Sequence, residues 1–323
     1  MLITLKTKRL LGSWIAVLLA ALALLGCTQT PKTHAELQKS ARECMRNQDF
    51  KCAEQDLQAY VRLRPNDGAA HARLGIAQNQ RSEVAKAVAS FQKAIALGEG
   101  TYDPFYYYAN SLANLGKTNQ AIDWYYKTLD VVPSLMDARG NLAKLLVQKK
   151  RYFEALALLA SFDDHLTTIG QQPYFTGQRI SFESDMRQAD PKQFEEKSQL
   201  RLSKTYGNFY APVILGQSRV TAFVVDTGAK FTVVSDHFLR KSKARYKFVR
   251  SGVEMRIANG GRVRANLINI NSMMLGAFHL KDVSAVECSG CVLLPGEKNL
   301  SRFDLTSRKV EGVEFLTLRP RKI

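Results

Sequence analysis

A carboxylate stands at the end of an apolar run in the stretch Val220-Thr-Ala-Phe-Val-Val-Asp-Thr-Gly-Ala-Lys230. A charge beside apolar residues costs free energy unless a partner offsets it, so the position of Asp226 needs a reason. A carboxyl group can exchange protons, and the Thr227 hydroxyl can form a hydrogen bond. Gly228 lets a second backbone approach closely because it has no side chain. These residue types predict acid–base chemistry centred on Asp226.

Other catalytic patterns find little support in the sequence. The five histidines are scattered, and the chain has no His-Glu-x-x-His, no Gly-x-Ser-x-Gly and no phosphate-binding glycine loop. Cys288-Ser-Gly-Cys291 could form half of a zinc site, but no second pair of ligands lies nearby in the sequence. We therefore expect neither a metal nor another cofactor.

The residues around Asp226 follow a β pattern. After Gln199, short apolar runs are separated by turn residues, and no long amphipathic helix is evident. The runs cover 210–215, 220–225, 231–234, 253–257 and 267–275, and the turns include Gly216, Gly252 and Gly276. This pattern predicts an all-β barrel or sandwich over residues 199–323.

Phe223-Val-Val-Asp-Thr-Gly-Ala229 is similar to the active-site motif of aspartic proteases, and the small domain around it resembles the retroviral-type, or retropepsin-like, family. Residues 210–225 resemble the hairpin that leads into the motif. Cys291-Val-Leu-Leu-Pro-Gly296 resembles the apolar-apolar-Gly turn that closes the family's fold. The resemblance covers nearly all of residues 199–320. It implies a closed barrel in which Asp226, Thr227 and Gly228 form the catalytic loop.

The resemblance also implies a homodimer. The family's chemistry needs two carboxylates, one protonated and one acting as a base, which together activate a water without an acyl-enzyme. The chain has a single Asp-Thr-Gly, so two copies of Asp226 have to meet on a two-fold axis. Two departures from the family pattern leave open the alternative that the chain is a folded but inactive relative. Pro295 is inserted in the closing turn, and the ammonium of Lys230 could lower the pH at which the pair works.

A mobile lid is expected over residues Ala258, Asn259, Gly260 and Gly261, where the family carries its flap. Asn-Gly between alternating residues is a strong signal for a short hairpin, and the second glycine loosens the tip. Such a lid could close over a peptide and exclude water. A plain surface hairpin is the alternative.

The first half of the chain repeats with a fixed period. Small residues recur 34 positions apart, each followed four residues later by a bulky side chain: Ala53, Ala87, Ala121 and Ala155, then Leu57, Phe91, Tyr125 and Leu159. This resembles the tetratricopeptide repeat, in which helix pairs stack because none can bury its apolar face alone. Four such units would bind a peptide or protein partner, or would act as a spacer.

The amino terminus has the residue pattern of an export signal. Lys6, Lys8 and Arg9 precede an apolar run that ends in Leu24-Leu-Gly-Cys27. This ending resembles the lipobox of bacterial lipoproteins, which implies that Cys27 is acylated and anchors the chain in the cell envelope, facing the periplasm. A plain signal peptide or a membrane anchor is the alternative. Thr28 is not the aspartate that retains many lipoproteins in the inner membrane, which favours the outer membrane.

Charge is unevenly distributed between the two halves. Residues 197–323 contain 22 Lys+Arg against 9 Asp+Glu, a net charge of +13, whereas residues 27–196 have a net charge of +1. Six of the eleven residues in 240–250 are basic, which predicts either solvated surface or binding to anionic lipid headgroups or acidic substrates. Nucleic acid is not an expected partner of an exported chain.

The remaining four cysteines form two local pairs in the sequence, Cys44 with Cys52 and Cys288 with Cys291. Disulfides are plausible in an oxidising periplasm, and the local pairing is the simplest of the three that four cysteines allow.

These observations predict an all-α tetratricopeptide-repeat solenoid followed by an all-β retropepsin-like closed barrel. The expected segments are a signal peptide (1–26), a tether (27–33), four repeats (34–170), a linker with at most a short helix (171–198) and the β-domain (199–323). The first functional hypothesis is a membrane-anchored aspartic endopeptidase whose repeats recruit substrate or partner. The second is an adaptor lipoprotein whose catalytically silent β-domain serves dimerisation.

Overall fold

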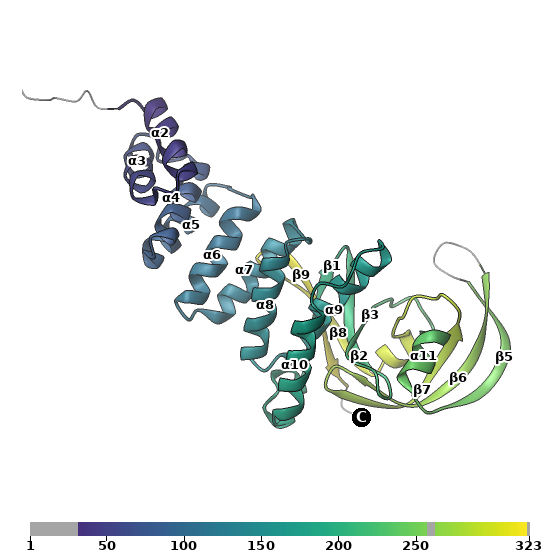
Figure 1. Ribbon diagram of the computed structural model, residues 1–323. Coiled ribbons are helices and arrows are strands. Elements are labelled where there is room, and N and C mark those ends of the chain that lie inside the picture. Colours follow the sequence, from purple (N-terminus) through teal and green to yellow (C-terminus); the bar gives the residue numbers. More distant parts are fainter. Residues whose placement is uncertain (1–31, 257–261, 322–323) are drawn as a thin grey trace, which may run out of the picture. The chain divides into compact units, whose positions relative to one another are not determined.

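The computed structural model of the chain describes residues 32–256 and 262–321 (Figure 1). The proposed lipidation site Cys27 and the proposed flap residues Ala258, Asn259, Gly260 and Gly261 lie outside the described residues. No helix within the described ranges is both long and apolar enough to cross a membrane. Residue contacts divide the chain into two compact units at the boundary between Asn66 and Asp67.

Antiparallel helix pairs form the first part of the chain, as the 34-residue period predicts (Figure 1). The alanines that recur with this period have no exposed surface, because each lies where one helix packs closely on its partner. The helices are α2 (His34–Arg46), α3 (Phe50–Leu63), α4 (Gly68–Gln80), α5 (Val84–Ala96), α6 (Tyr102–Asn114), α7 (Thr118–Val131), α8 (Met136–Gln148) and α9 (Tyr152–Thr168). The predicted repeat solenoid is confirmed.

Short polar side chains fix where several of these helices begin. Thr33 and Glu36 form a reciprocal capping box at the start of α2, and the Asp49 carboxylate accepts a hydrogen bond from the Cys52 N–H at the start of α3. Asp67 caps α4 in the same way. Each cap satisfies backbone donors that the first turn of a helix leaves unpaired.

The second part of the chain is a β-rich domain, as predicted. Within the described residues its strands follow the order β4-β7-β6-β2-β1-β9-β8, with β3 paired to β2 and β5 paired to β6. The strands are β1 (Leu200–Thr205), β2 (Asn208–Ile214), β3 (Thr221–Val224), β4 (Thr232–Ser235), β5 (Tyr246–Arg256), β6 (Arg262–Leu275), β7 (Phe278–Cys288), β8 (Phe303–Val310) and β9 (Val313–Pro320). Two short helices, α11 (Asp236–Ser242) and α12 (Glu297–Leu300), interrupt them.

The expectation of a closed barrel is wrong. The two ends of the strand order, β4 and β8, do not pair with each other among the described residues, so the sheet stays open. The physical reason lies in β1 and β9, which pack against helices α7 and α9. Their apolar surface is buried by the repeats and does not need the opposite edge of the sheet.

The segment 171–198 also differs from the expected linker. It contains α10 (Thr176–Gln188), which packs against α9. The Asp163 carboxylate of α9 accepts hydrogen bonds from the backbone N–H groups of Tyr174 and Phe175 and pairs with Arg179 at 3.2 Å. Arg179 in turn donates to the carbonyl of Val220, just before β3, at 3.0 Å. The connection between repeats and sheet is therefore a packed part of the structure.

A buried charged network joins α9 to the β-domain. Glu154 accepts hydrogen bonds from Tyr126, Arg151 and Arg201, the last of which lies on β1. Burial raises the pKa of Glu154, but the two guanidinium groups outweigh that effect and hold its pKa below the usual range. The Arg201 guanidinium also lies over the ring of Phe315 on β9, at 4.3 Å from the ring centroid.

A second buried carboxyl group, that of Glu196 just before β1, contacts the first turn of α9. It accepts hydrogen bonds from the backbone N–H groups of Phe153 at 3.0 Å and Glu154 at 2.6 Å. Burial and the neighbouring Glu154 carboxylate raise the pKa of Glu196 to about 8, against the opposing effect of the two N–H groups.

We expect the stability of the chain to fall as the pH rises from about 4.5 to about 8, because over this range Glu196 keeps its proton when folded and loses it when unfolded. The native state then binds more protons than the unfolded state, which contributes a slope of at most about 1.4 kcal/mol per pH unit. Urea denaturation at several pH values should show a shallower slope for Glu196→Gln than for the wild type. Parallel curves would contradict the raised pKa.

Candidate active site

Asp226 lies in the turn between β3 and β4. Its Oδ1 atom accepts a hydrogen bond from the Gly228 N–H at 2.9 Å, and its carbonyl accepts one from the Ala229 N–H at 3.3 Å. Strand β3 pairs with β2 before the turn, and β4 pairs in parallel with β7 after it. The two strands therefore hold both ends of the turn in place.

The side chains of Asp226 and Thr227 are exposed in the single chain, as is Gly228. The apolar run before them becomes progressively accessible, from buried Phe223 to partly exposed Val225. The carboxylate therefore projects beyond the core into solvent, which avoids the desolvation cost that its sequence position implies. One chain thus presents the three predicted catalytic residues together on its surface.

A second segment of the chain supports this turn. The Leu293 carbonyl accepts a hydrogen bond from the Val224 N–H at 2.9 Å, and Leu294 exchanges two backbone hydrogen bonds with Val233. Further along, the Glu297 N–H donates to the Ala229 carbonyl at 2.6 Å. Residues before and after Pro295 thus form hydrogen bonds with the strands and the turn around Asp226. The inserted proline does not interrupt this support.

The support is completed by two buried polar residues that the sequence analysis did not identify. The Thr232 hydroxyl accepts hydrogen bonds from the Gly296 N–H at 3.1 Å and from the Asn299 side chain at 2.8 Å. Neither Thr232 nor Asn299 has exposed surface. The sequence did contain one signal for this contact. Thr232 is the single hydroxyl residue in the apolar run after the motif, and a buried hydroxyl needs a hydrogen-bond partner.

A small apolar cluster lies next to the turn, separate from the main core of the domain. Its members come from the end of the turn, from strands β4, β5, β6 and β7, and from the segment that follows β7. They are Phe231, Val233, Met255, Ala265, Leu267, Val286, Cys288 and Cys291. Lys230 is exposed beside it, with its ammonium 5.9 Å from the centroid of the Phe231 ring. The turn is therefore flanked by apolar surface and one cation.

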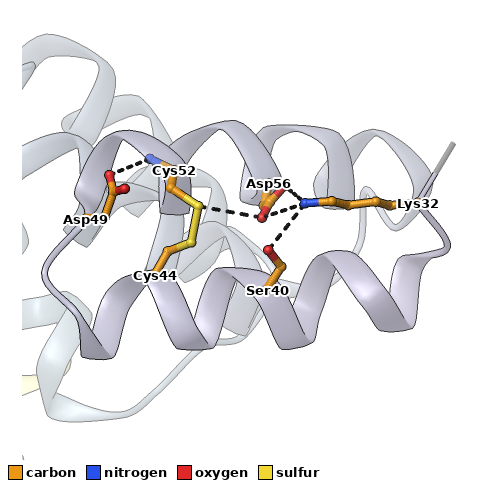
Figure 2. Close-up of a disulfide and its surroundings, with 6 residues drawn as sticks. All are labelled: Lys32, Ser40, Cys44, Asp49, Cys52 and Asp56. Carbon is orange, nitrogen blue, oxygen red and sulfur yellow. Dashed lines mark hydrogen bonds and ion pairs between the residues drawn. A yellow bond between two sulfur atoms is a disulfide. The ribbon is translucent and has the colours of Figure 1, made fainter. Parts of the chain in front are cut away.

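The cysteines are joined in the two local pairs, Cys44 with Cys52 and Cys288 with Cys291. Figure 2 shows the first pair linking α2 to α3, beside an ion pair between Lys32 and Asp56 at 3.0 Å. Cys44, Cys52 and Asp56 are the group of potential metal ligands among the described residues. The disulfide occupies both sulfur atoms and Lys32 occupies the carboxylate, so this group is not arranged to bind a cation.

The fold and the turn define a class of protein: tetratricopeptide repeats followed by a retropepsin-like aspartic-protease domain. The comparisons with known families agree. Residues 213–292 match the family described as gag-polyprotein putative aspartyl protease, and residues 39–104 match a tetratricopeptide-repeat family. The resemblance drawn from Asp226-Thr-Gly and from the 34-residue period is thereby confirmed.

Similar individual proteins each cover part of the chain. Photosystem I assembly protein Ycf3 of Acaryochloris marina (strain MBIC 11017) is 32% identical over 90 residues, which is 27% of this chain. The chain spans 54% of the length of that curated relative. Among solved structures, MamA shares 24% identity over 46% of this chain and 86% of its own, with a TM-score of 0.36. A retropepsin-like aspartic protease from Rickettsia conorii shares 20% identity over 38% of this chain and 92% of its own, with a TM-score of 0.29.

Proposed function

We propose that this chain is an aspartic endopeptidase whose active site forms when two copies bring their Asp226 turns together. The observation that carries the proposal is the Asp226 turn itself, which is exposed at its tip and held at its base by residues 293–297. An exposed carboxylate on a firmly held turn is available to a second copy. A single such turn supplies only half of the two-carboxylate chemistry.

In the proposed dimer the two carboxylates share one proton, because two like charges at close range do not both ionise easily. The ionised carboxylate takes a proton from a water as that water attacks the peptide carbonyl, and the protonated one gives its proton to the carbonyl oxygen. Gly228 allows the two turns to approach, and the Thr227 hydroxyl is placed to bond across to the partner's backbone. The titration then belongs to the pair and not to either residue.

The remaining parts of the proposal concern where the enzyme works and how it finds its substrate. Acylation of Cys27 would hold the chain at the cell envelope, facing the periplasm, with the outer membrane favoured by Thr28. Two disulfides in the described residues support an oxidising compartment. The repeats would recruit a protein or peptide substrate, or a partner, since stacked helix pairs present an extended binding surface.

Mixing subunits tests the shared active site. The wild-type chain from Thr28 onward is held at constant concentration with an envelope extract while the Asp226→Asn chain is added, and new peptide termini are counted by mass spectrometry. Because mixed dimers carry only one carboxylate, an equal amount of the variant should reduce cleavage to about half, and an excess should reduce it further.

The matched control is Asp304→Asn, which changes an exposed carboxylate on β8 that pairs with Arg321. Added Asp304→Asn chain should increase cleavage, because its dimers keep both catalytic groups. If added Asp226→Asn chain left wild-type cleavage unchanged, each chain would act alone and the two-copy site would be wrong. If the wild type released no new peptide termini, the enzyme hypothesis would be wrong, and the hypothesis of an adaptor with a catalytically silent β-domain would take its place.

A further inference from the structure

The outer strand of the sheet carries an exposed strip of aromatic and basic side chains. Phe248, Val249 and Tyr246 on β5 are 61%, 56% and 44% exposed. Among the described residues this is the place where three large exposed apolar side chains fall within four positions. Exposed basic residues surround them. We call this surface the basic–aromatic edge, made of Lys241, Lys243, Arg245, Tyr246, Lys247, Phe248, Val249 and Arg250.

The two aromatic side chains of this edge, Tyr246 and Phe248, lie on the same face of the sheet as its core. Tyr246 is paired with Ile270 and Phe248 with Ile268, so the side chains of each pair share one face. Ile268 and Ile270 are buried, whereas their partners on β5 are not. Strand β5 pairs only with β6 among the described residues and forms the outermost strand there (Figure 1). The exposure is thus a property of the sheet's outer edge.

The edge is held in a fixed position at its beginning. Ser242, at the end of α11, is buried, and its hydroxyl donates to the Leu239 carbonyl at 2.8 Å. The Ser242 carbonyl accepts a hydrogen bond from the Gln217 N–H at 2.6 Å, and its hydroxyl accepts one from the Ala244 N–H at 3.3 Å. The basic side chains therefore project from an anchored segment and not from a loose loop.

The charges of the edge are not neutralised within the chain. Arg240, just before it, pairs with Asp236 at 3.1 Å. The basic residues that follow, Lys241, Lys243, Arg245, Lys247 and Arg250, have no ion pair with any carboxylate in the part of the chain that the structure describes. Five uncompensated cations around three apolar side chains create a surface that attracts an anionic partner with an apolar layer beneath its charges.

We propose that the basic–aromatic edge docks on the anionic phospholipid surface of a membrane. The side chains fit this partner because long Lys and Arg side chains reach phosphate groups while Phe, Tyr and Val enter the boundary with the acyl chains. A second copy that met the chain edge to edge is disfavoured, since it would bring its own five uncompensated cations against the same five. The proposal does not depend on catalysis.

Vesicle binding of the chain from Thr28 onward tests the proposal without the acyl anchor. This chain keeps every described residue, and sedimentation compares vesicles of phosphatidylcholine alone with vesicles that also contain phosphatidylglycerol. We expect binding to the anionic vesicles only, weakened by salt. Each basic side chain near such a surface contributes about fivefold to binding, so Lys243→Gln with Lys247→Gln should weaken it about 25-fold. Phe248→Ser with Val249→Ser should weaken it about tenfold.

The matched control removes two exposed charges elsewhere, Arg308→Gln with Lys309→Gln on β8, and should bind like the wild type. A Phe248→Trp variant adds a depth probe, since Trp124 is the only tryptophan after Thr28. Its emission should shift to shorter wavelength with anionic vesicles as the indole enters the interface. Equal binding to both vesicle types, or an equal loss in the β8 control, would overturn the proposal. So would binding of polyglutamate through these residues without vesicle binding, which would indicate an acidic protein partner.

Discussion

Asp226→Asn is expected to abolish peptide-bond cleavage while the chain stays folded. The asparagine can neither take the proton of the attacking water nor give one to the carbonyl, so the rate of cleavage should fall by about a thousandfold or more. Stability should change by no more than about 0.5 kcal/mol, because the side chain is exposed and an amide oxygen can still accept the Gly228 N–H. Cleavage of envelope peptides and urea denaturation of the same preparations measure the two effects.

The Asp304→Asn chain serves as the control for this comparison, since it also converts an exposed carboxylate into an amide. It should cleave like the wild type. Dimer formation is measured by sedimentation, and Asp226→Asn should weaken it no more than the control does, because two neutral amides can meet at the two-fold axis without taking up a shared proton. Cleavage by Asp226→Asn at the wild-type rate would place the catalytic group elsewhere.

Local sequence signals predicted most of the elements. The alanine period identified the helix pairs because a close helix crossing admits only a small residue, and each of those alanines is fully buried. The Asp-Thr-Gly turn was identified by its resemblance to the aspartic-protease motif, with apolar runs on both sides of it. These features depend on residues near one another in the sequence, where the spacing itself carries the structural information.

Features that depend on distant residues could not be predicted in this way. The Thr232–Asn299 hydrogen bond joins residues 67 positions apart, and Arg201 reaches back to Glu154 from the other domain. The open sheet has the same origin. Strands β1 and β9 alternate as barrel strands do, and nothing within them indicates that α7 and α9 bury their outer surface. The sequence analysis expected a linker where α10 lies. The contacts that stabilise this helix are with α9 and with Val220 before β3, and the sequence of the segment does not show them.

The Asp226 turn also depends on the space left by Gly296, and Gly296→Ala is expected to destabilise the chain by about 3 kcal/mol or more. A Cβ at this position would overlap the backbone of Phe231 and Thr232. Its backbone φ of −81° is ordinary, so the constraint is steric and not conformational. Because neither backbone can move alone, the Gly296–Thr232 and Glu297–Ala229 hydrogen bonds should weaken together. Urea denaturation measures the loss of stability.

Gly177→Ala provides the control, because no atom lies within 4 Å of its added Cβ. Gly177 lies in the first turn of α10, where alanine should leave stability unchanged or raise it by up to about 1 kcal/mol. If the displaced Gly296 carries residues 229–232 with it, Gly296→Ala should also lose cleavage under conditions in which most of the chain is still folded. A Gly296→Ala chain as stable as the wild type would mean that residues 293–297 do not press against the turn, and the supported Asp226 turn would then be wrong.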